Sequence, residues 1–264
     1  MKIVVCIKQV PDTTSGVVKV DELGVLRRDL MPTIINHDDK TAIEAALQLR
    51  EKLGGTVTIV TMGPPQADIA MREALAMGAD EAVILGGREF AGSDTYATSG
   101  ILAGAIKNMD YDVIITGRQA IDGDTAQVGP QLGEKLGLPQ VTYVEEIIEA
   151  TEEYLVVKRQ FEDGYHIIKI KTPCLLTAIQ ELAEPRYMTV SGVWEAYKKE
   201  VKTIGFEDIK DSLEVEWIGL KGSPTNIYES FTKELKGAGT VLKDLSPEKF
   251  VEAIVEKLDE KHII

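Results

Sequence analysis

Short apolar runs rich in β-branched residues alternate with stretches of helical spacing along the first 145 residues, and this alternation constrains the fold most. The runs are residues 2–8, 56–61, 82–85, 111–116 and, shorter, 140–143. Strands that alternate with helices in this way form βαβ units and a parallel sheet. We therefore expect an α/β protein with a doubly wound, mostly parallel sheet. The loops after Cys6, Thr61 and Thr116 should share one crevice at the strand ends, where the strand order reverses.

Two β-hairpins are predicted as well. Residues 17–29 form a short alternating stretch that turns near residues 22–24. Beyond residue 145 the alternating runs 154–160 and 166–171 flank an acidic turn that ends in glycine. Residues 173–177 then predict one more buried strand.

The last quarter of the chain has a different character. A polar helix is predicted at 193–202, and an amphipathic helix at 247–261 follows a long stretch of weak periodicity. A long segment with little core of its own usually lies against a partner. We therefore expect an α/β domain over residues 1–202 and a C-terminal arm over residues 203–264.

Charge and apolar pattern exclude several kinds of partner. With 29 basic and 43 acidic residues the net charge is −14, which opposes binding to a nucleic acid backbone. Cys6 and Cys174 both stand in apolar runs, so we expect buried reduced thiols. The chain opens directly on a strand pattern, and no apolar run is long enough to span a bilayer. We expect a cytoplasmic protein without membrane insertion.

Residues 113–131, VIITGRQAIDGDTAQVGPQ, are the strongest candidate for a small-ligand site. The first four residues predict a strand buried on both faces, Gly117 ends it, and helical spacing resumes at Val128. A strand, a glycine loop and a helix N-terminus together present free backbone N–H groups to an anion, usually a phosphate. From the residues alone, a plain polar crossover loop is an equally good interpretation.

No catalytic constellation accompanies this loop. The motifs GxSxG, HExxH, GxGxxG, the Walker sequence and paired cysteines with metal-ligand spacing are all absent. His37, His166 and His262 occur in unrelated surroundings, where a surface role is the better interpretation. We therefore expect neither a catalytic side chain nor a metal site.

A family resemblance favours the ligand site over the plain loop. Over essentially its full length, the chain resembles the β subunit of electron-transferring flavoprotein. The stretches that carry the resemblance are residues 4–12 (VVCIKQVPD), residues 117–124 (GRQAIDGD) with Gln127 and Gly129, the run 157–177, and residues 184–187 (EPRY). The run departs from the family signature at His166, where the signature carries an acidic or amide residue.

This resemblance implies an adenine-nucleotide α-hydrolase-like fold that binds AMP or FAD and pairs with a larger α subunit carrying another FAD. Carried over by position, the cofactor-binding residues would be Cys6, Asn36, Asp39, Thr61, Met62, Gly63, Gly117, Arg118, Gln119, Asp122, Gly123, Asp124, Thr125, Ala126, Gln127, Val128, Gly129 and Gln131. The side chain of Asn36 would bond adenine or ribose, and the amides of residues 123–129 would hold phosphate.

The resemblance also implies a partner-docking segment at residues 184–202. Its docking residues would be Glu184, Pro185, Arg186, Tyr187 and Val190. Within this set, Val190 stands at the position of an apolar anchor side chain.

Details of the loop resemble one branch of the family. Members that hold AMP carry DNNQTGQM or DDCNQTGQM, whereas this chain reads DTAQVGPQ over residues 124–131. That sequence is similar to the flavin-bifurcating members of anaerobes, as are residues 219–225 (GLKGSPT). The small Ala126 and the missing hydroxyl at Val128 would make room for a ligand larger than AMP.

The implied function is therefore electron bifurcation. The β subunit would bind FAD and accept a hydride from NADH. One electron would pass to ferredoxin and the other, through the α-subunit FAD, to a flavin dehydrogenase of the acyl-CoA or lactate type. The alternative is a subunit that holds AMP as a structural nucleotide and acts as a docking platform for a dehydrogenase. A nucleotide-hydrolysing stress protein would share the fold, but it would carry a glycine-rich phosphate motif that is absent here.

Overall fold

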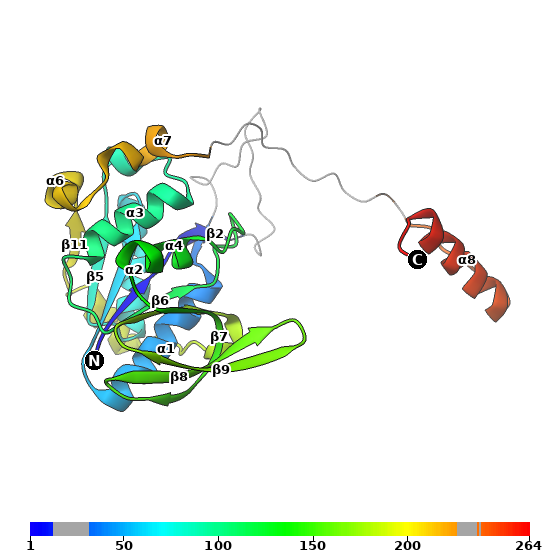
Figure 1. Cartoon of the computed structure of the whole chain (residues 1–264), viewed down its shortest axis with the longest axis horizontal. Helices are drawn as coiled ribbons and strands as arrows, with labels where there is room; N and C mark the ends of the chain where they lie inside the picture. Colours follow the sequence, from blue (N-terminus) through cyan, green and yellow to red (C-terminus); the bar gives the residue numbers. More distant parts are fainter. Residues whose placement is uncertain (13–31, 226–236, 238) are drawn as a thin grey trace.

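The computed structural model describes residues 1–12, 32–225, 237 and 239–264. The hairpin predicted at 17–29 lies outside the described residues. In the described part, nine strands form one sheet in the order β11-β5-β4-β1-β6-β10-β7-β8-β9 (Figure 1). These strands are β1 (Lys2–Cys6), β4 (Thr56–Met62), β5 (Glu81–Leu85), β6 (Val113–Gly117), β7 (Gln140–Ala150), β8 (Tyr154–Phe161), β9 (Gly164–Lys171), β10 (Cys174–Ala178) and β11 (Val201–Ile204).

The strands from β11 to β7 run parallel, and β1 lies in the middle of them between β4 and β6. Every residue of β6 and β10 is buried, as expected for parallel strands covered on both faces. The strand order reverses beside β1, because the chain first adds β4 and β5 on one side and later adds β6 on the other. The predicted doubly wound α/β fold is confirmed.

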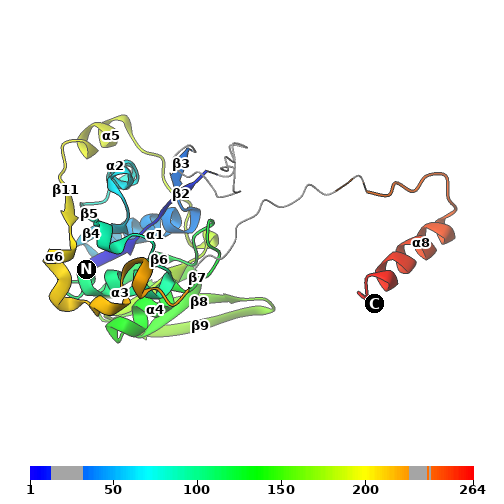
Figure 2. The ribbon, with the colours of Figure 1, turned by 90° about the horizontal axis from the view of Figure 1, so that it is seen from above.

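Helices cover both faces of this sheet (Figure 2). Helices α1 (His37–Leu53) and α2 (Asp68–Met77) pack on one face, and α3 (Thr95–Ile106) and α4 (Val128–Leu136) pack on the other. Neighbouring residues of β1 divide between the two cores, with Val5 on the α1 side and Val4 on the α3 side, because strand side chains alternate. Asp94 caps the start of α3, because its carboxylate accepts the N–H of Ala97 at 3.0 Å.

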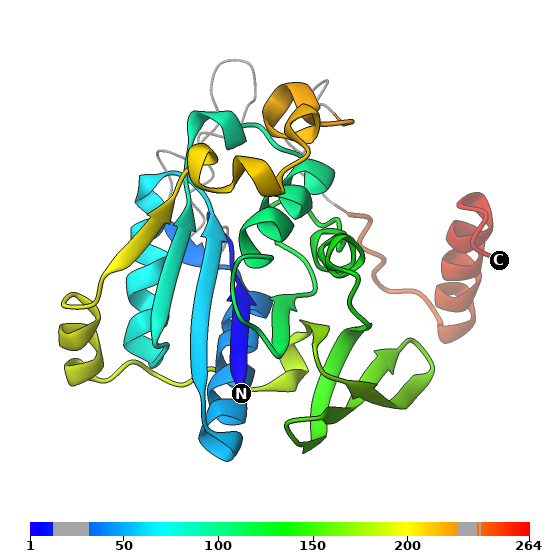
Figure 3. The ribbon, with the colours of Figure 1, turned by 60° about the vertical axis from the view of Figure 1, so that its left-hand side comes forward.

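An antiparallel extension completes the sheet. β7 pairs with β8, and β8 pairs with β9 along its whole length, so the predicted hairpin is confirmed. Figure 3 shows this extension at the opposite end of the sheet from β11. A separate antiparallel pair, β2 (Gln9–Pro11) and β3 (Thr33–Ile35), follows β1 and precedes α1.

The predicted helix at 193–202 is wrong in its second half. Helix α5 (Val190–Ala196) ends early, and the chain continues as β11, which pairs parallel with β5. β11 has half-buried ends and an exposed middle, so its apolar pattern is too weak to identify an edge strand. The strand also crosses the expected division between residues 202 and 203.

The first part of the predicted arm packs on its own chain. Ile209, Leu213 and Ile218 belong to or pack against the α3-side core. The elements here are α6 (Phe206–Ile209), η5 (Lys210–Ser212), η6 (Val215–Trp217) and α7 (Gly219–Gly222); short 3₁₀ turns elsewhere are η2 (Pro65–Ala67), η3 (Arg88–Phe90) and η4 (Gln180–Leu182).

The last helix, α8 (Pro247–Glu260), confirms the amphipathic helix predicted near the C-terminus. Ser246 caps its first turn, and no residue of the helix is buried. Figure 1 shows α8 standing apart from the sheet. Among the described helices, α8 included, no helix has both the length and the apolar character needed to cross a membrane.

Candidate cofactor site at the strand ends

The loops after β1, β4 and β6 meet at the carboxyl ends of these strands, as the sequence predicts. The hydroxyl of Thr61 donates to the carbonyl of Ile7 at 2.8 Å, which ties the end of β4 to the end of β1. The ammonium of Lys8 lies 2.7 Å from the carboxylate of Asp122, which ties the β1 loop to the loop after β6. The candidate loop, residues 117–131, therefore lies with the loops after β1 and β4 at one edge of the sheet.

Asp39, in the first turn of α1, joins two of these strand ends. Its buried carboxylate accepts the N–H of Lys8 at 2.7 Å and the N–H of Gly117 at 3.0 Å. Burial raises the pKa of Asp39 to about 7, although hydrogen bonds from Lys8, Asn36 and Gly117 act in the opposite direction. The carboxylate is thus used inside the protein, where it fixes the start of the candidate loop.

Asn36 holds the next part of the loop. Its Nδ2 donates to the carbonyl of Gln119 at 2.8 Å, and its Oδ1 accepts the N–H of Ile121 at 3.1 Å. The residue is fully buried, and its side chain makes no capping bond to α1, although it occupies the N-cap position. Both polar ends of the side chain are therefore used inside the protein, where they hold the loop.

The middle of the candidate loop is a tight turn. The N–H groups of Gly123 and Asp124 both donate to the carbonyl of Ala120, at 3.2 and 2.9 Å, and Gln119 Nε2 donates to Asp124 Oδ1 at 2.9 Å. Asp124 and Ala126 have left-handed φ angles of 48° and 52°, which costs a non-glycine residue about 1–2 kcal/mol. Such strain is concentrated at ligand and active sites. Gly123 and the neighbouring Thr125 are exposed, and space is open where a Cβ at Gly123 would stand.

Helix α4 begins where the loop ends. Its first residues are Val128, Gly129 and Pro130, and Gln127 at the N-cap makes no side-chain bond to it. The first N–H groups of a helix have no partner within the helix, so those of Val128 and Gly129 can face an anion. A Cβ at Gly129 would lie 2.7 Å from the hydroxyl of Thr116, so only glycine lets this helix end approach β6 so closely.

Two contacts place the start of α3 beside the start of α4. The hydroxyl of Thr95 donates to Oε1 of Gln127 at 2.9 Å, and the hydroxyl of Ser99 donates to Oε1 of Gln131 at 3.2 Å. The side-chain amides of Gln127 and Gln131 are thereby oriented by α3.

A positive charge lies in the same loop. The N–H of Arg118 donates to the carbonyl of Ala178 at 2.8 Å, and its guanidinium lies 3.5 Å from Asp38 and 5.8 Å from the ring centre of Tyr143. Nε of Arg118, the atom that lies 3.5 Å from Asp38, is buried and makes no hydrogen bond in the protein. The Arg118 side chain is 35% exposed, so the rest of its guanidinium can bind an anionic group such as a nucleotide phosphate.

Three further predicted residues lie at the ends of β1 and β4 or directly after them. Cys6 is a buried free thiol, and so is Cys174, as predicted. Burial, and to a smaller extent the charge of Asp39, raises the pKa of Cys6 to about 12. Met62 is half-buried and packs on the α3-side core, and Gly63 donates its N–H to the carbonyl of Leu85 at 3.1 Å.

Sequence reasoning missed Lys8, Asp38 and Thr95, which hold Asp122, Arg118 and Gln127. Lys8 could have been found, because it directly follows a strand whose end was expected to line the crevice. Asp38 and Thr95 follow no strand directly, and only the folded chain brings them to the loop.

The predicted docking segment lies elsewhere on the chain. Residues 183–189 have no regular secondary structure, and Tyr187 and Val190 are 96% and 91% exposed. Arg186 was expected among the docking residues, but its guanidinium turns inward to Glu44 and Glu51 of α1.

Comparison with known proteins decides the family. Residues 24–209 match the electron transfer flavoprotein domain. A protein of Clostridium acetobutylicum named electron transfer flavoprotein subunit beta is 52% identical, over the full length of both chains. The chain belongs to the electron transfer flavoprotein family, among the β-type subunits.

Other relatives of this flavoprotein subunit carry names of reductase complexes. The acryloyl-CoA reductase electron transfer subunit gamma of Anaerotignum propionicum is 52% identical, and the subunit CarD of the caffeyl-CoA reductase-Etf complex of Acetobacterium woodii is 48% identical. Both similarities cover the full length of both chains.

Proposed function

We propose that this β-type subunit holds FAD in the crevice at the strand ends, within a complex that bifurcates the electrons of NADH. One electron goes to ferredoxin. The other goes through the FAD of an α subunit to a partner dehydrogenase. The observation that carries the proposal is the strained loop that leads from Arg118 to the uncapped N-terminus of α4.

The residues present fit a nucleotide. The N–H groups of Val128 and Gly129 would bind phosphate oxygens, Arg118 would add positive charge, and the open space at Gly123 would let a ligand approach the backbone. The bound flavin would supply the redox chemistry. The chain itself would bind and orient it, through a loop held in place by Asn36 and Asp39. No side chain need act as a general acid or base.

The names of the relatives support a coenzyme A-linked partner. The proteins of Anaerotignum propionicum and Acetobacterium woodii are named for acryloyl-CoA and caffeyl-CoA reductases. We propose an acyl-CoA dehydrogenase or reductase as the partner, docked on the exposed side chains of the docking segment, and an α subunit contacted by the chain beyond residue 225.

The test is an anaerobic assay of the purified αβ pair with NADH, ferredoxin, an acyl-CoA dehydrogenase and its enoyl-CoA substrate. We expect ferredoxin to be reduced only when all the other components are present. Enoyl-CoA reduction that proceeds equally well without ferredoxin, or a pair that does not oxidise NADH, would contradict bifurcation and favour the AMP-holding alternative.

A further inference from the structure

The docking segment, residues 184–202, begins with a stretch that backbone pairing does not hold. Residues 183–189 belong to no helix or strand, and α5 after them is short. Tyr187 and Val190 are almost fully exposed, and Trp194 is largely exposed. The position of these apolar side chains must therefore be fixed by neighbouring residues that contact the body of the protein.

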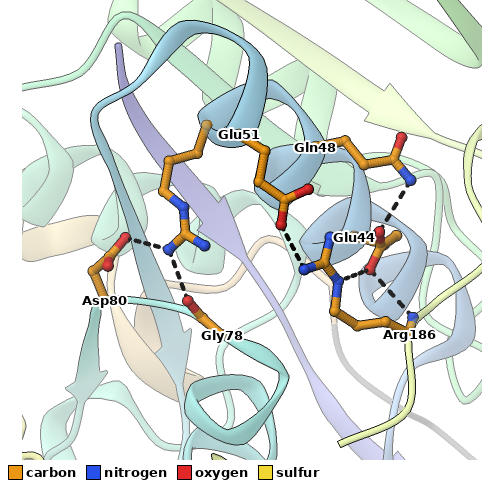
Figure 4. A network of polar contacts seen from close by, with 7 residues as sticks. Glu44, Gln48, Glu51, Gly78, Asp80 and Arg186 are labelled. Atoms are coloured by element: carbon orange, nitrogen blue, oxygen red, sulfur yellow. Dashed lines mark hydrogen bonds and ion pairs between the residues drawn. The ribbon is translucent and has the colours of Figure 1, made fainter.

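Arg186 makes the main contact of this kind (Figure 4). Its Nε and Nη2 donate to the two carboxylate oxygens of Glu44, at 2.7 and 2.9 Å, and its Nη1 donates to Glu51 at 2.6 Å. Its backbone N–H also donates to Glu44, at 3.2 Å. A two-pronged bond between a guanidinium and a carboxylate fixes direction as well as distance. The residue that directly precedes Tyr187 is thus locked onto α1.

Because Glu44 is buried, its carboxylate needs the positive charge of Arg186. Its side chain is 5% exposed, and Gln48 Nε2 donates to it at 3.0 Å. Burial alone would raise the pKa of Glu44, but the hydrogen bonds from Arg186 and Gln48 outweigh burial and lower it. A buried carboxylate that loses its cation is left with an uncompensated charge. Glu51 is half-exposed and makes one of the bonds, so it contributes less.

The far side of the exposed stretch is fastened separately. Nη1 of Arg72, on α2, donates to the carbonyls of Ala196 and Lys199 at 2.7 and 2.6 Å. Between the two anchors, α5 packs against the C-terminal end of α2, where a Cβ at Gly192 would lie 2.6 Å from the carbonyl oxygen of Ala76. A hollow of about 380 Å³ lies beside this contact. Val190 therefore stands at the start of a helix that α2 holds, whereas Tyr187 lies before that helix, directly after Arg186, in a stretch without helix or strand.

We propose that Arg186 is a positioning residue for electron delivery to the partner dehydrogenase. By clamping Glu44 it fixes Tyr187, and with it the entry of the chain into α5 at Val190, in the conformation that the partner binds. This inference rests on the docking role given to residues 184–202 in the proposed function.

The test compares Arg186→Gln, Arg186→Lys and Glu51→Gln in the complete αβ protein. Amide hydrogen exchange of residues 187–194 should become about 10-fold faster in R186Q, while peptides from β1 and β6 stay unchanged. R186K keeps the positive charge but cannot make the two-pronged bond to Glu44. Its exchange rate should therefore lie between those of R186Q and the wild type. E51Q is the matched control and should change exchange by less than about 3-fold.

Kinetics provide the second measurement. The apparent KM for a purified acyl-CoA dehydrogenase should rise about 10-fold in R186Q with kcat retained, because docking and not chemistry is affected. The rate of NADH oxidation with a small artificial dye as the electron acceptor should be the same in R186Q as in the wild type. A Val190→Asp variant reports on the docking role itself.

The outcomes separate the two proposals. If V190D raises the KM but R186Q leaves both the KM and the exchange at wild-type values, Arg186 is not a positioning residue although docking at this segment stands. If V190D leaves the KM unchanged, the docking role fails, and the inference about Arg186 fails with it.

Discussion

The N–H of Gly117 donates to the carboxylate of Asp39 at 3.0 Å, and the same carboxylate leaves no room for a side chain at residue 117. A Cβ there would come within 2.2 Å of Asp39 Oδ1. The end of β6 and the first turn of α1 therefore touch where the candidate loop begins. Hydrogen bonding between the backbone of the loop and the start of α1 therefore shapes the loop.

Replacing Gly117 by alanine should destabilise the protein. The added methyl group must displace Asp39 or the strand end, which costs about 1–3 kcal/mol in the free energy of unfolding. Gly123→Ala is the control, because nothing lies within 4 Å of a Cβ at that position, and it should stay within about 0.5 kcal/mol of the wild type. Urea unfolding measures both. Equal stability of the two variants would refute the close contact with Asp39.

Replacing Gly123 by valine should separate binding from folding. The position is open in the protein alone, so the unfolding midpoint should hardly change, whereas the side chain should crowd a nucleotide that approaches the backbone. Nucleotide released by acid from the purified αβ pair should drop several-fold. A full nucleotide load in G123V would mean that the ligand lies elsewhere.

The buried carboxyl of Asp39 should make stability depend on pH. Its folded pKa of about 7 lies above the ordinary value of 3.8, so the folded state holds the proton more tightly than the unfolded state. The stability contributed by Asp39 is greatest below the ordinary pKa, and it is lost as pH rises towards 7, by at most about 1.4 kcal/mol per pH unit.

Asp39→Asn removes this titration. The wild-type advantage over D39N in free energy of unfolding should therefore be larger at pH 5 than at pH 7.5. Asp163→Asn, on the exposed turn between β8 and β9, makes the same change of charge and should show no such difference. A wild-type advantage over D39N that is the same at pH 5 and pH 7.5 would rule out the raised pKa.

Two truncations should behave differently. Stopping the chain after Thr225 removes α8, of which no residue is buried, so the unfolding free energy should be retained while association with the α subunit weakens. Stopping after Lys202 cuts β11 and removes Ile209 and Ile218 from the α3-side core, which should destabilise the protein by several kcal/mol. Size-exclusion chromatography with the α subunit and urea unfolding measure the two effects. If the chain that stops after Thr225 still associates with the α subunit as well as the full chain does, the C-terminal arm does not hold the α subunit.

The central sheet could be predicted because the sequences of β1, β4 and β6 are apolar enough to be buried on both faces. β11 could not, because an edge strand with an exposed lysine and threonine in its middle has no clear apolar pattern. The packing of residues 206–222 on α3 was missed for a similar reason, since their apolar residues are widely spaced.

The place of the candidate loop followed from its glycines, but its internal support did not. Gly117 and Asp39 are 78 positions apart in the sequence, and a hydrogen bond over that distance has no local signal. The inward turn of Arg186 is similar, because its partner Glu44 is 142 positions away. A motif identifies such residues as belonging to a site without saying which way they point.

The most direct test of the account is the identity and number of nucleotides in the purified αβ pair. Nucleotides released by acid should be separated and quantified against protein concentration. FAD at two equivalents per heterodimer, without AMP, is the result that the account predicts. One equivalent of FAD together with one of AMP would contradict it and assign the crevice between β1 and β6 to a structural nucleotide.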